Sequence, residues 1–186
     1  MSIYKNVIIL LVALVLIQCT KENKYLVEKG KVGYLNTKTT MNDLSKIFEN
    51  DSIVTSKSNM EDENLFLLND NEYIIFSKDG EKILEIEPVI LDDSLSTIKC
   101  IQIFDTNYKT EKGISLKSTF KDINQHYLVN KVETTLTSAT LFIDELNATI
   151  AIDKKELGLS PFNRDQIALE QIPDMAKVKY FTIWFN

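Results

Sequence analysis

Thr40-Met41-Asn42-Asp43-Leu44-Ser45-Lys46-Ile47-Phe48 is matched 79 positions later by Thr119-Phe120-Lys121-Asp122-Ile123-Asn124-Gln125-His126-Tyr127. In both segments an apolar residue follows the threonine, an aspartate lies three positions after it, and apolar or aromatic residues come one and five positions after the aspartate. A threonine hydroxyl can satisfy the free N–H groups of a helix start, and a carboxylate in the first turn suits the helix dipole. The two segments therefore predict two short helices in related positions.

A second pair of segments repeats at nearly the same spacing. Ile98–Phe104 matches Val178–Trp184 80 positions later, and both are typical of strands. Each half also contains a hairpin-like passage, Tyr73–Ile86 with its Asp79-Gly80 turn and Leu141–Ile152. Agreement in order and spacing predicts an internal duplication and an α+β fold of two related halves, each a short helix packed on an antiparallel sheet.

The repeat also sets the expected boundaries along the chain. We expect a signal peptide at residues 1–18, a tether at 19–30, a first α+β repeat at 31–107 and a second at 108–186. Additional short helices are expected near Asp165–Glu170 and at Lys154–Leu157.

The first eighteen residues have the pattern of an export signal. Lys5 precedes an unbroken apolar run, Val7–Ile17, which ends just before Cys19. At about 1.5 Å per residue, a helix of that length covers only about half of a bilayer core. A cleaved signal peptide is therefore preferred over an uncleaved short anchor or a buried helix.

Leu16-Ile17-Gln18-Cys19 resembles the lipobox of bacterial lipoproteins, although Gln18 departs from the small residue usual before the cysteine. The resemblance implies that Cys19 carries a diacylglycerol thioether and an amide-linked chain such as palmitate, enough to hold the protein on a membrane. Lys21-Glu22 resembles the charged surface-export signals of Bacteroidota lipoproteins. The residue after Cys19 is Thr20 and not the aspartate that retains lipoproteins in the inner membrane. These features imply an outer-membrane lipoprotein, with the leaflet left open.

The mature chain also resembles modular envelope proteins. Gly33–Phe48 and Gly113–Tyr127 are similar to the tandem modules of β-lactamase-inhibitor-protein-like proteins and of small outer-membrane-assembly lipoproteins. The resemblance implies a module that binds another protein of the envelope, and no enzyme.

Composition excludes one class of partner and limits the chemistry of the cysteines. The net charge is −6 and Arg164 is the single arginine, so no basic cluster exists to bind nucleic acid. If Cys19 carries lipid, Cys100 is the one thiol left. Within the apolar run Ile98–Phe104 a small buried hydrophobe is preferred over a redox role.

The sequence offers no catalytic signature. His126, the single histidine, aligns with Ile47, and we expect a partly buried, hydrogen-bonded imidazole there in preference to a general base. Gly-rich phosphate loops, CxxC pairs and HExxH are absent. We expect the acidic pair Asp92-Asp93 to lie in a solvated loop and the pair Asp144-Glu145 to lie in a hairpin turn. We therefore predict no catalytic residue, no cofactor and no metal site.

Tyr180 and Trp184 are the candidate partner-binding residues. In a strand they share one face, while Phe181 and Ile183 share the other. The plain interpretation is a strand covered on both sides; the sharper one leaves Tyr180 and Trp184 partly exposed as anchors. We therefore predict a non-catalytic, protein-binding lipoprotein. The alternative is a lipoprotein that binds or hydrolyses a glycan or small ligand, which would need a pocket with carboxylates and a stacked aromatic ring.

Overall fold

The computed structural model describes residues 23–55, 72–91, 93–160 and 165–185. The expected signal peptide, Cys19 and Arg164 lie outside these residues. No helix in the described part of the chain is long and apolar enough to span a membrane.

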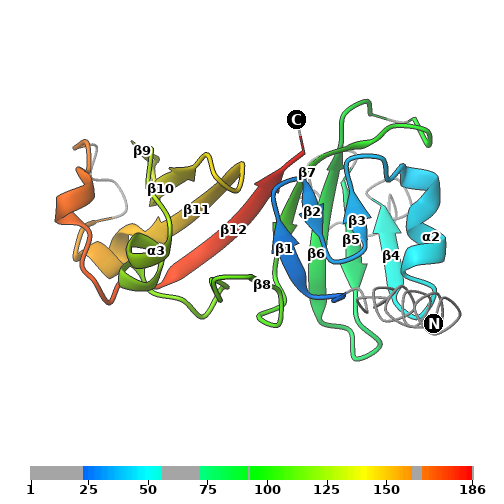
Figure 1. Ribbon diagram of the computed structural model, residues 1–186, viewed down its shortest axis with the longest axis horizontal. Coiled ribbons are helices and arrows are strands. Elements are labelled where there is room, and N and C mark those ends of the chain that lie inside the picture. Colours follow the sequence, from blue (N-terminus) through cyan, green and yellow to red (C-terminus); the bar gives the residue numbers. More distant parts are fainter. Residues whose placement is uncertain (1–22, 56–71, 92, 161–164, 186) are drawn as a thin grey trace, which may run out of the picture.

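The described strands form one large antiparallel sheet and one small sheet (Figure 1). In sheet order the large sheet contains β4 (Ser52–Thr55), β5 (Tyr73–Phe76), β6 (Lys82–Pro88), β7 (Ile98–Ile103), β12 (Val178–Trp184), β11 (Ala148–Asp153), β10 (Ser138–Ile143) and β9 (Lys131–Thr134). The small sheet contains β3 (Leu35–Asn36), β2 (Lys31–Val32), β1 (Leu26–Glu28) and β8 (Lys109–Thr110). An α+β fold with antiparallel pairing is thus confirmed.

The two four-stranded meanders join edge to edge, which the sequence did not reveal. β7 and β12 pair antiparallel through Phe181 with Ile103 and Ile183 with Ile101, so the large sheet is continuous. Its strand order is symmetric about this central pair. A second unexpected feature is the parallel pairing of β1 with β8, which joins Leu26 and Val27 to Lys109 and Thr110.

Both predicted threonine starts are helix N-caps. The backbone N–H of Thr40 donates to Asp43 Oδ2 at 2.8 Å, and that of Thr119 donates to Asp122 Oδ2 at 2.8 Å. The first helix opens as a 3₁₀ turn, η1 (Met41–Asp43), and continues as α2 (Leu44–Ile47); the second is α3 (Phe120–His126). The capping boxes explain why each helix begins at its threonine.

The minor helices agree only in part with the sequence. A 3₁₀ turn, η4 (Lys154–Leu157), lies where a helix is expected. The helix expected near Asp165–Glu170 forms only in part, as a 3₁₀ turn, η5 (Leu169–Gln171), which overlaps the last two residues of that segment. Segments this short nucleate an α-helix poorly.

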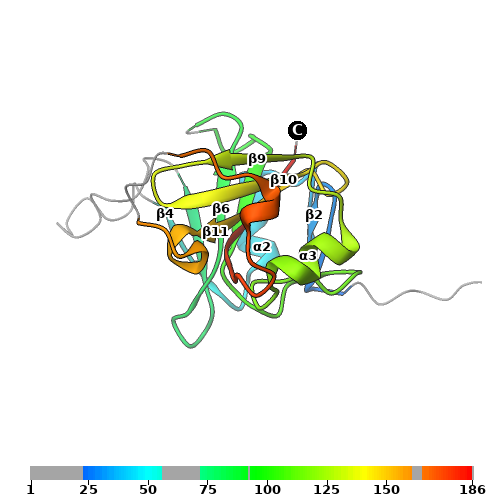
Figure 2. The same cartoon turned by 90° about the vertical axis from the view of Figure 1, so that its left-hand side faces the viewer.

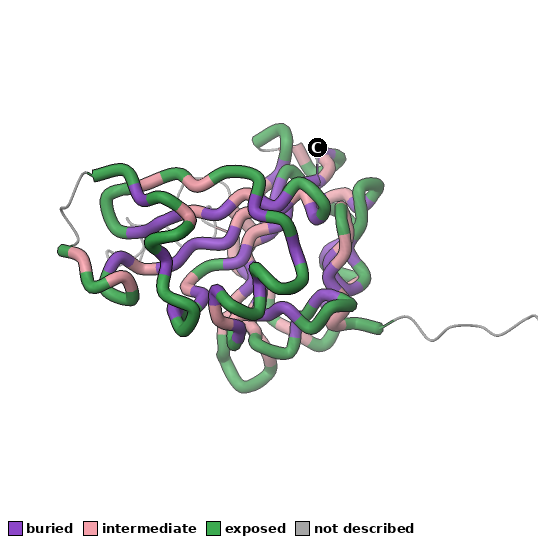
Figure 3. The backbone as a smooth tube through the Cα atoms, turned by 60° about the vertical axis from the view of Figure 1, so that its left-hand side comes forward, coloured by how far each residue is buried: buried purple, intermediate pink, exposed green. Residues whose placement is uncertain are grey.

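The core lies between the large sheet on one side and the helices and small sheet on the other. Figure 2, which views the molecule from one end, places α2, α3 and β2 on the same side of the large sheet. Phe181 and Ile183 are fully buried on this inner face, as are Leu44 of α2 and Ile123 of α3. Figure 3 shows the buried backbone running through both halves, and these residues belong to one continuous hydrophobic cluster.

Three local expectations have definite outcomes. Cys100 is buried in β7 with its Sγ 3.3 Å from Glu87 Oε2, and burial raises the pKa of the thiol to about 12, as suits a core residue. The expectation for His126 is wrong: it is the exposed last residue of α3, and Tyr127 takes the buried place. Within the predicted tether, Leu26–Glu28 form β1 and Val27 is buried, so the folded part begins before residue 31.

Candidate functional site

The strand β12 presents Tyr180 and Trp184 on the outer face of the large sheet, away from the helices. Phe181 and Ile183 point into the core, while Tyr180 is 40% exposed and Trp184 is half-buried. Trp184 Nε1 donates to Thr149 Oγ1 on β11 at 3.2 Å. Four residues of strand separate the two aromatic side chains by about 13 Å, so they do not form one contact point.

Lysines on the outer face are already paired within the protein. Lys179 Nζ lies 2.8 Å from Asp153 Oδ2 and 5.1 Å from the centre of the Tyr180 ring. The hydrogen bond to Asp153 raises the pKa of Lys179. Lys82 is paired with Glu85 and lies 4.0 Å from the ring centre of Phe104 in the same way. These pairs neutralise charge across the face, so it does not attract a strongly charged partner.

A groove lies at the end of β12, and we call it the Trp184 groove. It has a volume of about 530 Å³, and its lining comprises Glu87, Pro88, Val89, Leu91, Thr97, Ile98, Lys99, Trp184 and Phe185. The connection from β6 to β7 forms one wall and the end of β12 forms the other. Trp184 therefore lines a groove, whereas Tyr180 lies outside its lining.

The wall contributed by the β6–β7 connection is unusually apolar for an exposed loop. Val89, Ile90 and Leu91 are 57%, 58% and 52% exposed, and Leu95 is 70% exposed. The loop is held in place, because the Val89 N–H donates to the Thr97 carbonyl at 2.9 Å and the Ile90 N–H donates to Ser96 Oγ at 2.8 Å. Sequence reasoning did not single out these aliphatic residues, although Val89-Ile90-Leu91 was a signal that could have found them.

A second hollow, which we call the tyrosine cavity, lies between the small sheet and the first half of the large sheet. Its volume is about 570 Å³. Tyr108 is 6% exposed and packs edge-on against Tyr25, with ring centres 5.3 Å apart at 88°. Tyr34 is 46% exposed and also lines the cavity. The lining further includes Lys24, Asn50, Asp51, Ser77, Lys78, Asp79 and Asp105.

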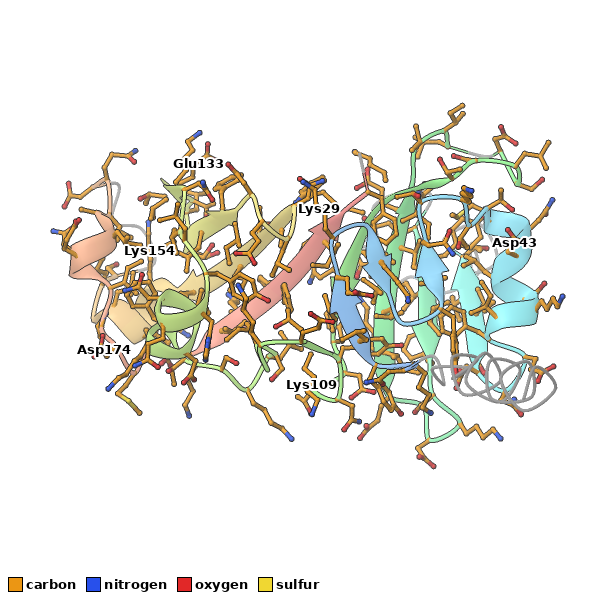
Figure 4. The ribbon with its side chains drawn as sticks, in the orientation of Figure 1. Lys29, Asp43, Lys109, Glu133, Lys154 and Asp174 are labelled. Atoms are coloured by element: carbon orange, nitrogen blue, oxygen red, sulfur yellow. The ribbon has the colours of Figure 1, made fainter. Side chains whose placement is uncertain are left out.

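Acidic side chains do not assemble a recognisable metal site. Among the described residues, no three His, Cys, Asp or Glu side chains lie close enough together to hold a metal ion. Figure 4 shows Asp43 at one end of the molecule and Asp174 at the other. Asp144 and Glu145 occupy the turn between β10 and β11, as predicted.

Comparison with known proteins supports the fold alone. No protein-family profile matches the sequence, and no curated protein matches it. The crystal structure of the uncharacterized protein yfeY from Escherichia coli is similar, with a TM-score of 0.52 and 12% sequence identity over 87% of this chain and 99% of that chain. At this identity the likeness establishes a shared arrangement of helices and strands, and no activity follows from it.

Proposed function

We propose that this chain is a lipid-anchored envelope lipoprotein that binds another protein through the Trp184 groove and catalyses no reaction. The anchor is proposed from the apolar run before Cys19 and its lipobox-like residues. The outer membrane is the proposed location, with the leaflet left open.

The observation that carries the proposal is the exposed aliphatic wall beside Trp184. Val89 and Leu91 line the groove and are 57% and 52% exposed, and Ile90 and Leu95 of the same loop are exposed as well. Hydrogen bonds from the Val89 and Ile90 N–H groups hold the start of this loop in place. Large apolar side chains exposed together beside a groove favour an interaction site. A half-buried tryptophan in the adjoining wall is the residue type that most often anchors a protein interface.

The rim of the groove favours a protein over a lipid occupant. Lys99 Nζ lies 2.5 Å from Glu87 Oε1, so both signs of charge border the apolar wall. An apolar centre with a polar, mixed-charge rim is the usual anatomy of a protein interface.

We also propose that the chain arose by internal duplication, with units at residues 31–107 and 108–186. Corresponding hydrogen bonds support this proposal. Thr40 bridges Thr97 and Thr119 bridges Lys177, at offsets that match the sequence repeat. The strands preceding β7 and β12 each carry a register shift, opposite Cys100 and Tyr180 respectively. A module of this kind suits binding, because its two copies give a wide rigid sheet to carry the loops.

In-cell crosslinking followed by mass spectrometry tests the proposed function. The tagged wild-type protein is compared with Cys19→Ser, Leu91→Asp, Trp184→Ala and the control Leu136→Asp, which alters an aliphatic side chain that is 63% exposed in the second half. We expect one envelope protein to crosslink to the wild type and to Leu136→Asp, and to be lost with Leu91→Asp and Trp184→Ala. Loss with Cys19→Ser would support the anchor separately.

Two outcomes contradict the proposal. If Leu91→Asp and Leu136→Asp recover the same proteins in the same amounts, the groove is not the binding site. If the wild type recovers only proteins that an unrelated lipoprotein control also recovers, the protein-binding function itself fails.

A further inference from the structure

We propose that the tyrosine cavity of the first half binds a saccharide. Its lining includes Lys24 and Tyr25, near the start of the described residues, and shares no residue with the lining of the Trp184 groove. Its volume of about 570 Å³ falls within the range of roughly 300–1,000 Å³ found for small-molecule sites. The two sites therefore involve different residues and can be tested independently.

Aromatic rings supply the apolar part of the site. Tyr108 is almost fully buried and is fixed by its edge-on contact with Tyr25. Tyr34 remains 46% exposed while lining the same cavity. A tyrosine offers an apolar ring face and a polar hydroxyl together, which matches a sugar ring with its C–H faces and peripheral hydroxyl groups.

Polar side chains of both hydrogen-bonding kinds line the cavity. Asp51, Asp79 and Asp105 accept hydrogen bonds, Lys24 and Lys78 donate them, and such a mixture suits hydroxyl groups, which do both. Asp105 is held in position, because its Oδ1 accepts from the backbone N–H and from Nδ2 of Asn107, each at 2.8 Å. Three carboxylates against two ammonium groups disfavour phosphorylated ligands.

In the second half a lysine lies beside the aromatic residue that follows the helix. Phe48 follows α2 and lines the tyrosine cavity, while Tyr127 follows α3 in the same way. Lys112 Nζ lies 4.2 Å from the centre of the Tyr127 ring and 2.6 Å from Glu145 Oε1, and it donates to the His126 carbonyl at 3.0 Å. The aromatic residues that follow the two helices therefore have different neighbours, an open cavity beside Phe48 and a lysine beside Tyr127.

The saccharide could be free or could be the headgroup of a membrane lipid. Lys24 lines the cavity and follows Cys19 by five residues, a span of at most about 18 Å when fully extended. If Cys19 is acylated, as proposed above, the cavity lies within reach of headgroups on the same membrane. The chemistry recognised is the same in both cases.

Isothermal titration calorimetry on the full-length, detergent-purified protein tests the proposal. The probes are N-acetylglucosamine, galactose, glucuronic acid and phosphatidylcholine vesicles containing monogalactosyl diacylglycerol. We expect at least one probe to bind with a dissociation constant of about 1 mM or lower. Binding of free galactose identifies a soluble sugar as sufficient, and binding to these vesicles but not to vesicles of phosphatidylcholine alone identifies a lipid-linked headgroup.

Variants locate the binding within the molecule. Tyr34→Ala and Asp79→Asn, both at exposed positions, are expected to weaken binding by about tenfold or more. Asp144→Asn makes the same chemical change in the matching hairpin turn of the second half and is expected to leave binding unchanged. If no probe binds, or if Asp144→Asn weakens binding as much as Asp79→Asn, the proposal is overturned.

Discussion

The connections between the third and fourth strands of the two meanders bury their apolar residues to different extents, although Met175 in the second connection is also exposed. In the second half, residues 154–177 join β11 to β12, and Ile167, Ile172 and Ala176 in this connection are buried in the core. In the first half the shorter connection from β6 to β7 leaves Ile90 and Leu95 largely exposed. Since the same place in the same sheet can bury such residues, their exposure in the first half is not imposed by the fold.

The surroundings of the aromatic residue that follows each helix also differ between the halves. The tyrosine cavity is open beside Phe48, whereas Lys112 occupies the space beside Tyr127. Both candidate sites therefore involve first-half elements, and the second half contributes Trp184 and Phe185 to one of them. The halves thus differ at these two places, although the second half also exposes Leu128, Leu136 and Met175.

The largest expected effect tests whether the halves form one folding unit. Phe181 is fully buried in β12 and pairs with Ile103 across the junction of the two halves. Phe181→Ala is expected to lower the free energy of unfolding by about 3–5 kcal/mol. Urea unfolding followed by Trp184 fluorescence and by far-UV circular dichroism should give one coincident transition, because a single core spans both halves.

Thr182→Ala is the control for this substitution, because Thr182 is the half-buried neighbour of Phe181 in β12. We expect its effect to be much smaller. Two separated transitions in the wild type would mean that the halves unfold independently. They would then be two domains and not one folding unit.

A smaller effect is expected at the two N-caps. Thr40→Ala and Thr119→Ala each remove a hydroxyl that hydrogen-bonds to the aspartate three residues later. Each is expected to lower the free energy of unfolding by about 0.5–2 kcal/mol, and the two values should agree if the helices are equivalent. Ser45→Ala and Asn124→Ala, at matching exposed positions in α2 and α3, serve as controls with smaller expected effects. If only Thr119→Ala lowers the free energy of unfolding, the two helix starts are not equivalent.

Local sequence signals predicted the parts of the fold that depend on local contacts. Thr119 with Asp122 marks a helix start, and Asp79-Gly80 marks a tight turn in which Gly80 adopts a φ of 80°. Neither signal needs information from elsewhere in the chain. The strands with clear apolar alternation, such as Val178–Trp184, were also predicted for this reason.

Features that depend on distant contacts were not predictable in this way. The parallel pairing of β1 with β8 joins strands of three and two residues that lie about eighty positions apart, and no local pattern encodes it. His126 aligns with Ile47 and each residue ends its helix, but Ile47 is half-buried whereas His126 is exposed, so the alignment gave the position and not the surroundings. The tyrosine cavity combines residues from several separate segments, so only the folded chain brings Tyr25, Tyr34 and Tyr108 together.

The smallest expected effect concerns the pH dependence of stability. Hydrogen bonds from the backbone N–H and side chain of Thr40 hold the pKa of Asp43 below its ordinary value of 3.8, and Thr119 lowers the pKa of Asp122 in the same way. Because each pKa is lower in the folded state, each carboxylate contributes stability above its unfolded pKa and loses it as the pH falls through the folded pKa. Both aspartates are exposed, so the contribution is small.

Urea unfolding between about pH 5 and pH 2 measures this dependence. Asp43→Asn and Asp122→Asn should each lower stability at pH 5 and flatten its decline on acidification, because the substituted side chain cannot titrate. If both substitutions flatten the pH dependence of stability equally, the two helix caps have the same energetics as well as the same hydrogen bonds. A flattening found only with Asp122→Asn would indicate that the 3₁₀ start of the first helix couples less tightly to its cap than the α-helical start of the second.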